Sequence, residues 1–302
     1  MTTPDLTSPL RRRRLARTAP SPFTTRVRTV TTVRSLVIGF TTLLVVWQLA
    51  SMVVARTFAV PEQVLPSIPD ILGEFKGLSD YWKGGLGLKA VQDGGDQTYR
   101  GAVLALAYGA WTTTLRMLAG FTLACIVGIA LGIVIGLSAR LRRLSLGPLA
   151  LLAALPLLAM LPLFSFWFGA TTKAAIWFVF YGTVVTVVRA TVNAVDNVPR
   201  RYTDQARTLG ATRLQLFRRV LLPAILPELR AGLTLALTFA WSMVLGAELL
   251  GVQGGLGAMM SQAIEFSALG RMVFISGVFI ILAAASVTAF SRLTGRLLRW
   301  MA

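Results

Sequence analysis

The sequence has 302 residues, of which 55% are hydrophobic and 14% are charged, and its mean hydropathy is +0.69. This composition excludes an ordinary soluble domain, because the charges are grouped between long uncharged runs. The net charge of +18 does not indicate nucleic acid binding, since the basic residues follow the pattern of membrane loops. One cysteine, Cys125, excludes an internal disulfide, and the absence of histidine removes the commonest metal ligand and general base. We expect no metal site and no catalytic residue.

Six uncharged runs predict six membrane-spanning helices. Most are close to the roughly 20 residues that cross a hydrocarbon core of about 30 Å, and in lipid the backbone must satisfy its own hydrogen bonds as a helix. The runs are Ser35–Ala55, Met117–Ala139, Leu144–Ala170, Ala174–Val188, Ala231–Ala247 and Met272–Ser291. The sequence therefore predicts an all-α integral membrane protein with a basic, disordered tail at 1–34 and a transmembrane domain at 35–302. The tail is expected to be attracted to anionic lipid.

The distribution of positive charge predicts the orientation. If the first span leaves the cytoplasm, the cytoplasmic segments hold 22 of the 30 Lys and Arg residues. This bias predicts that both termini are cytoplasmic (N-in, C-in). The apolar run Gly101–Leu115 would reverse every later segment if it crossed the membrane, so we interpret it as an interfacial helix within an outer segment, 56–116. That segment is too small for a ligand-binding domain.

The second span carries a stripe of small residues, one every fourth position. Such a stripe lets helix backbones approach closely in lipid, where packing drives association. Its members are Gly120, Ala124, Gly128, Gly132 and Gly136. The third run contains Pro148, Pro156 and Pro162, which predict kinks. Kinks are typical of helices that line a pathway, and they are also common in structural bundles.

The loop 189–230 contains a predicted pair of short helices. Pro199 favours a helix start, Gly210 a helix end, and Thr212 to Gln215 matches a capping box that begins the second helix. We expect Pro223 and Pro227 to end that second helix. An amphipathic hairpin on the lipid surface is the simpler alternative, but the fixed caps favour a docking surface for another protein.

This loop resembles the EAA loop of ABC-importer permeases. The family pattern runs E-A-A, three residues, G, then an apolar stretch that closes at L-P, and Asp204-Gln205-Ala206 stand at its first three positions here. Asp replaces Glu and Gln replaces the first Ala. The surroundings of Arg116 resemble the entry to the core spans of that family. The stretch from Glu248 to Gly257 is similar to its nitrate, sulfonate and taurine branch.

The resemblance implies a multi-pass permease subunit of a bacterial plasma (inner) membrane. This subunit would couple through the loop to separate cytoplasmic ATPases, which would bind ATP and Mg. This chain has no phosphate-binding loop and is expected to hold no cofactor. Other implied partners are a second copy of the chain, an external solute-binding protein and membrane lipid. The implied coupling residues are Asp204, Gln205, Ala206, Leu209, Gly210, Ala211, Phe217 and Pro223. Asp204 would pair with a basic residue of the ATPase or complement a helix N-terminus.

Four residues are candidates for the pathway of a small, anionic solute: Arg116, Trp241, Ser242 and Glu248. Ionisable residues near a span are functional candidates. For Glu248, the alternative to a pathway role is a structural ion pair with Arg116 or Arg271. For Arg116, attraction of an anionic solute and anchoring at the lipid headgroups both stay open. An autonomous channel or secondary transporter would need ionisable groups within the spans or inverted repeats, and a non-transport scaffold also stays open.

Overall fold

The computed structural model describes residues 33–58, 60–61, 64–82 and 97–297. These residues form helices and connecting segments, with no strand among them. The chain divides into two compact units, 1–49 and 50–302, and the boundary falls inside helix α1 (Val33–Thr57). The predicted tail, 1–34, lies outside the described residues except for its last two.

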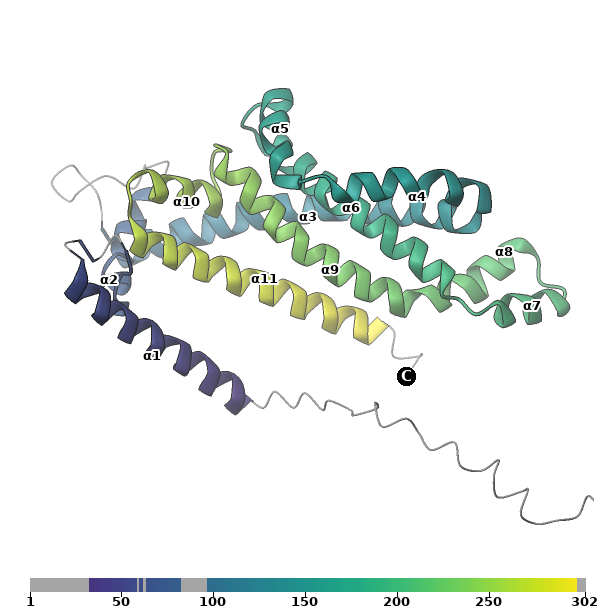
Figure 1. The fold of residues 1–302 in the computed structure, drawn as a ribbon, viewed down its shortest axis with the longest axis horizontal. Helices are drawn as coiled ribbons and strands as arrows, with labels where there is room; N and C mark the ends of the chain where they lie inside the picture. The colour runs from purple at the N-terminus through teal and green to yellow at the C-terminus, as the bar shows by residue number, and fades with distance from the viewer. Residues whose placement is uncertain (1–32, 59, 62–63, 83–96, 298–302) are drawn as a thin grey trace, which may run out of the picture. The chain divides into compact units, whose positions relative to one another are not determined.

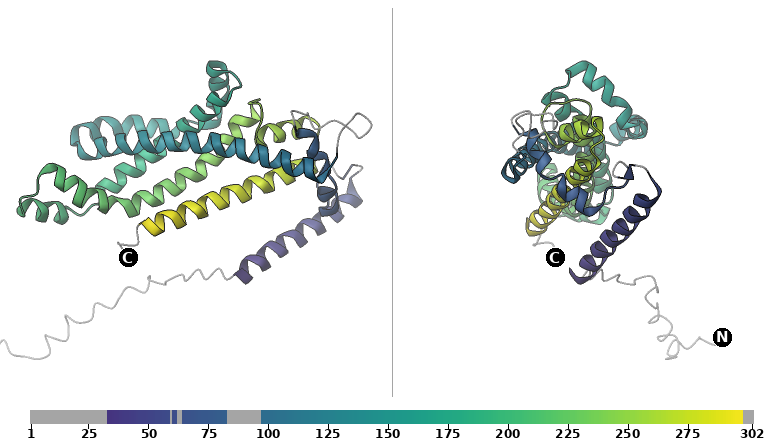
Figure 2. Two further views of the ribbon diagram at one scale, coloured as in Figure 1. Left: turned by 180° about the vertical axis from the view of Figure 1, so that it is seen from behind. Right: turned by 90° about the vertical axis from the view of Figure 1, so that its left-hand side faces the viewer.

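The second unit is a bundle of long helices with short helices at its ends (Figure 1). Helices α3, α6, α9 and α11 run side by side in the views of Figures 1 and 2. At one end lie α2, η2 and α10, and at the other lie α7 and α8. The elements are α2 (Ile68–Gly73), η2 (Lys76–Tyr81), α3 (Tyr99–Leu137), α4 (Ala139–Ala154), η4 (Leu157–Met160), α5 (Leu161–Phe168), α6 (Thr172–Asp196), α7 (Arg200–Thr208), α8 (Arg213–Gln215), η5 (Leu216–Leu221), α9 (Leu222–Leu249), α10 (Leu256–Glu265) and α11 (Leu269–Leu297).

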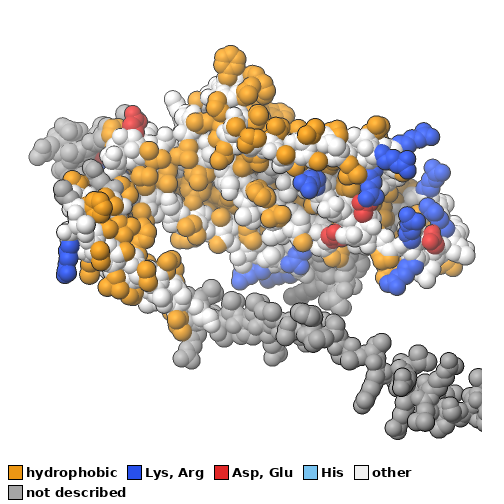
Figure 3. Space-filling view, in the orientation of Figure 1, with side chains coloured by type: hydrophobic (Ala, Val, Ile, Leu, Met, Phe, Trp, Pro, Cys, Tyr) orange, Lys and Arg blue, Asp and Glu red, His pale blue; other side chains and the backbone are white. Residues whose placement is uncertain are grey.

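The surface of the bundle is that of a membrane protein. Figure 3 shows apolar side chains over its middle and a group of Lys and Arg side chains at the end that carries α7 and α8. Five helices of the described part are long and apolar enough to span a membrane. A sixth candidate is the pair 139–154 and 157–168, bent by 83°. Each of the six predicted runs therefore lies mostly in helix, and the third run is broken at Leu155 and Pro156.

Helix α3 contains both the run predicted as an interfacial helix, 101–115, and the second predicted span. Its 39 residues form one helix that begins at the Thr98 cap. The two parts join because the first half buries a small-residue face, which includes Ala102, Ala105 and Gly109, against η2 and α10. At 1.5 Å per residue the helix is about 58 Å long, and it extends well beyond a hydrocarbon core of about 30 Å.

The small-residue stripe lies in the seam between α3 and α6. A Cβ added at Gly120 would lie 2.6 Å from Val179 Cβ, and one added at Gly132 would lie 2.5 Å from Thr191 Cβ. Gly128 and Gly136 meet residues of α6 in the same register, eight residues apart in both helices. Glycine is therefore required along this seam because the two backbones lie too close together for larger side chains.

Candidate functional site

The segment between α6 and α9, residues 197–223, is largely exposed, and we call it the connecting segment. It begins after α6, whose end is capped by the Asn197 amide donating to Asn193 O at 3.0 Å. Helix α7 then starts after Pro199, as the sequence predicts. Helix α6 itself continues eight residues beyond the predicted end at Val188, because Thr191, Val192 and Val195 are buried.

The end of α7 is fixed by a two-bond cap. The Gly210 amide donates to Arg207 O at 2.9 Å, and the Ala211 amide donates to Ala206 O at 3.0 Å. Gly210 has φ +76°, in the left-handed region that favours glycine. This is the Schellman arrangement, which satisfies carbonyls that a helix end leaves open. The chain therefore turns sharply and in one defined direction.

The second helix of the segment begins with the predicted capping box. The Thr212 amide donates to Gln215 Oε1 at 2.9 Å, and the Gln215 amide donates to Thr212 Oγ1 at 3.4 Å. The prediction that Pro223 and Pro227 end this helix is wrong. The helix passes through the π-helical turn η5 and continues as α9, so that 213–249 is one helix.

The π turn explains how the helix tolerates the first proline. Pro223 has no amide hydrogen, and its ring would clash with a carbonyl in a regular α-helix. Within the wider turn, the preceding Leu222 amide donates to Phe217 O, five residues back. Pro227 lies inside α9. The helix is maintained there because Leu221, Ile225 and Leu229 of the same helix pack into a buried cluster with α6.

Four of the eight implied coupling residues line one hollow of the connecting segment. The hollow has a volume of about 460 Å³ and lies between α7 and the start of α9. Its lining includes Gln205, Ala206, Leu209 and Pro223. Leu209 is 88% exposed, which is unusual for a leucine on an ordered helix end. The exposed Leu209 side chain and the hollow beside it are open to contact with another protein.

The other four implied residues surround this hollow. Asp204 is exposed and lies in the second turn of α7, too far from the helix start to be a first-turn complement of the helix dipole. Phe217 packs against the buried cluster under the segment. Gly210 and Ala211 form the turn. The connecting segment therefore exposes Asp204 and Leu209, while the helix caps and the packing of Phe217 fix its conformation.

Three of the four pathway candidates, Arg116, Trp241 and Glu248, are buried within the bundle. Arg116 Nη1 lies 2.7 Å from Glu248 Oε1, and the two side chains are 4% and 0% exposed. The structure thus selects Arg116 as the partner of Glu248, while Arg271 pairs with Glu74 at 2.8 Å. Trp241 Nε1 donates to Ser286 Oγ at 2.7 Å.

The other donors and acceptors of this ion pair also have hydrogen-bond partners. We call Arg116, Glu248 and the groups that bind them the polar cluster. Glu248 Oε2 accepts from Thr113 Oγ1 at 2.8 Å and from the Gly257 amide at 2.9 Å. The Arg116 guanidinium donates to Thr172 Oγ1 and to the carbonyls of Gln253 and Gly254. A buried pair with every partner present joins α3, α6, α9 and the start of α10. No sequence pattern indicates that the two carbonyls bind Arg116.

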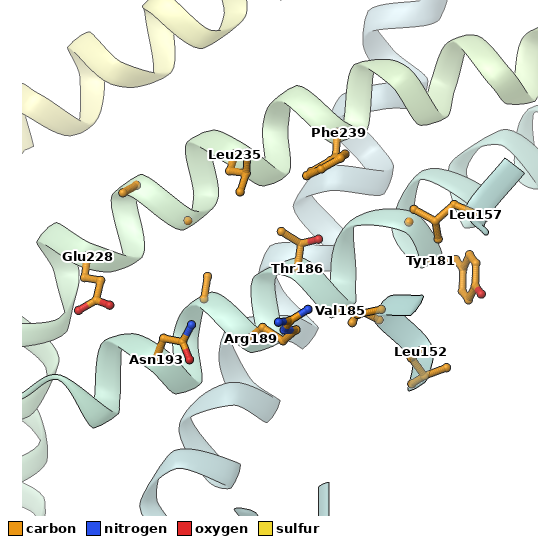
Figure 4. A pocket seen from close by; sticks show the side chains of 15 residues that line it. Leu152, Leu157, Tyr181, Val185, Thr186, Arg189, Asn193, Glu228, Leu235 and Phe239 are labelled. Atoms are coloured by element: carbon orange, nitrogen blue, oxygen red, sulfur yellow. The ribbon is translucent and has the colours of Figure 1, made fainter. Parts of the chain in front are cut away.

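A separate groove lies on the other side of α6 and α9, with a volume of about 560 Å³ (Figure 4). Its lining comes from α4, η4, α6 and α9. Exposed Ser242 does not line it, nor do the three buried candidates. The polar residues that do line it were missed: Tyr181, Thr186, Arg189, Asn193 and Glu228. Arg189 is the sequence feature that could have indicated this groove. Because it interrupts the apolar run, the prediction placed it just after the end of a span.

Comparison with known proteins identifies the fold. Residues 128–301 match the family described as the binding-protein-dependent transport system inner membrane component. The chain belongs to this family. The permease is therefore a multi-pass inner-membrane protein of a transport family and not of an enzyme family.

Relatives of the permease confirm the predicted branch. It is 37% identical over 143 residues to the nitrate import permease protein NrtB of Leptolyngbya laminosa, covering 47% of this chain and 50% of the relative. It is 35% identical over 188 residues to the putative aliphatic sulfonates transport permease protein SsuC of Bacillus subtilis, covering 61% and 67%. The taurine transport system permease protein TauC of Escherichia coli is 33% identical over 166 residues, covering 55% and 60%. The matched regions thus span about half to two thirds of these relatives.

A solved structure supports the fold alone. The permease is similar to a chain of the MetNI methionine ABC transporter in an inward-facing conformation, with a TM-score of 0.56 and 21% identity. The likeness covers 66% of the permease and 97% of that chain.

Proposed function

We propose that this permease forms half of the translocation pathway of an ATP-driven importer and receives its driving force through the connecting segment. A separate cytoplasmic ATPase would bind at the hollow beside Leu209 and would hold the ATP and Mg. A second copy of the chain would supply the other half of the pathway, and an external binding protein would deliver the solute. The solute would be a small oxyanion such as nitrate or a sulfonate.

The observation that carries this proposal is the exposed, doubly capped connecting segment at one end of the spanning helices. A lipid-surface hairpin would bury Leu209 in the membrane and would not need a fixed turn at Gly210. The segment is attached to both helices, because α7 follows α6 after residues 197–199 and η5 continues directly into α9. A push on α7 and α8 would therefore be transmitted to two membrane-spanning helices. The basic side chains at this end support its cytoplasmic orientation.

The test is to co-express the permease with the ATPase encoded beside it and to purify the assembly through the permease. We expect the variant Leu209→Asp to insert in the membrane but to lose the ATPase, because it places a charge in the apolar contact. Leu72→Asp is the matched control, since Leu72 is 62% exposed at the opposite end of the bundle. Equal recovery of ATPase with Leu209→Asp and wild type would contradict the proposal.

A further inference from the structure

The groove between α4, α6 and α9 contains a cation inside a membrane-spanning helix. Arg189 is the one charged residue of α6 between Lys173 and Asp196. It lies seven residues before the end of α6, which corresponds to about 10 Å along the helix. Charged side chains within spans are costly and mark ion or substrate pathways by default.

Within the described residues, no hydrogen bond or ion pair joins Arg189 to another group. Its acidic neighbours have other partners: Asp196 pairs with Arg142, and Glu228 Oε1 accepts from Asn197 Nδ2 at 2.6 Å. Arg189 and Glu228 are the two charged residues that line the groove, and Asn193 lies between them in the view of Figure 4. The guanidinium is therefore available to a ligand.

The residues around Arg189 form a polar track along one face of α6. Thr186 and Asn193 lie three residues before and four residues after it, on the same side of the helix. Helices α6 and α9 lie close together along the groove, because a Cβ added at Gly232 of α9 would lie 2.3 Å from Ala190 Cβ of α6. Apolar side chains, which include Leu157, Leu235 and Phe239, line much of the rest.

We infer that Arg189 is the residue that selects the solute in the pathway, and that it binds the oxyanion group of the solute with help from Thr186 and Asn193. This inference rests on the proposed function. A planar guanidinium with unfilled donors matches the oxygens of a nitrate or sulfonate group and forms strong charge-assisted hydrogen bonds. The groove volume of about 560 Å³ lies within the range of roughly 300–1,000 Å³ that is common for small-molecule sites.

A lipid phosphate would offer the same oxyanion chemistry, because a long arginine side chain can extend to the headgroups. The two sources differ in what the loss of Arg189 affects. A lipid contact would change lipid binding and leave uptake unchanged, whereas a solute contact would change uptake. Arg143 is a suitable control, since it is exposed on α4 and does not line the groove.

The experiment uses liposomes that contain the assembly with its ATPase and binding protein, and it measures ATP-dependent uptake of nitrate, methanesulfonate and taurine as probes. We expect Arg189→Gln to lower uptake by about tenfold or more, the size of a lost charged hydrogen bond. Arg189→Lys should keep a larger part of the uptake, and Arg143→Gln should keep nearly all of it. ATP hydrolysis without solute should be unchanged in every variant.

Two outcomes would overturn the inference. If Arg189→Gln takes up the probes as fast as wild type, Arg189 does not select the solute, and loss of bound anionic lipid in that variant would assign it to the headgroups. If the wild type hydrolyses ATP but takes up none of the three oxyanions, the proposed solute class fails, and this inference fails with it. The two failures are distinct because the first leaves wild-type uptake intact.

Discussion

The seam between α3 and α6 and the open side of the permease, by which we mean the groove and the connecting segment, each contain arginine and glycine in different roles. In the seam, Arg116 is enclosed with all its partners in place, and the glycines allow two helices to touch. On the open side, Arg189 has no partner within the described residues, and Gly210 turns an exposed segment with nothing within 4 Å of its missing Cβ. Arginine thus stabilises the fold in the seam and is available to a ligand in the groove, while glycine allows close helix packing in the seam and a left-handed turn in the connecting segment.

The largest effect should come from breaking the enclosed ion pair. Glu248→Ala leaves the Arg116 charge buried without its counterion, and such a change costs about 3–5 kcal/mol of folding stability. We expect the variant to lose monodisperse protein in detergent roughly 6–20 °C below wild type, or to fail to accumulate. The double variant Arg116→Met with Glu248→Leu should recover part of that loss. Wild-type thermal stability in Glu248→Ala would contradict the structural role of the polar cluster.

The next effect should come from filling the seam. Gly132→Val would place side-chain atoms where Thr191 already lies, and overpacking of this kind costs about 1–3 kcal/mol. Thermal denaturation in detergent measures the loss. Gly277→Val is the matched control, because nothing lies within 4 Å of a Cβ at that position on α11. If both variants lose the same stability, the stripe does not owe its glycines to helix contact.

Gly210→Ala should produce a smaller, local cost. An alanine at φ +76° is unfavourable by about 1–2 kcal/mol, and the strain falls on the turn between α7 and α8. We therefore expect weaker recovery of the ATPase and slower coupled hydrolysis with little change in thermal stability. Gly277→Ala, at an unstrained position, should leave both measurements at wild-type values. A stability loss without any effect on the ATPase would remove the turn from the coupling account.

The smallest effect on stability should be that of Arg189→Gln. Because Arg189 has no partner within the described residues, its loss should change stability by no more than about 0.5 kcal/mol. Arg116→Gln should be far more damaging. Thermal denaturation of the two variants side by side tests the contrast directly, and equal destabilisation would mean that Arg189 also holds the fold together.

Much of the fold was predictable because it depends on local patterns. The uncharged runs, the spacing of the stripe from Gly120 to Gly136, the left-handed turn at Gly210 and the capping box at Thr212 all act within one helix or one turn. The resemblance of the connecting segment to a known family was equally local.

The errors concern features that depend on packing between helices. A hydropathy run ends at its first charge, so Arg189 was placed in a loop, although buried residues after it keep α6 helical to Asp196. Pro223 and Pro227 were expected to end a helix that a π turn and the contact with α6 maintain. The carbonyls that bind Arg116 come from residues 137 and 138 positions away, and no local pattern indicates them.

The central claim is that the ATPase contacts the permease at the connecting segment, and site-specific photocrosslinking tests it most directly. A photoreactive residue is placed at position 209 and, as a control, at position 72, in membranes that contain the whole assembly. We predict that the ATPase is crosslinked from position 209 and not from position 72. An ATPase that co-purifies with the permease but never crosslinks from position 209 would contradict the claim.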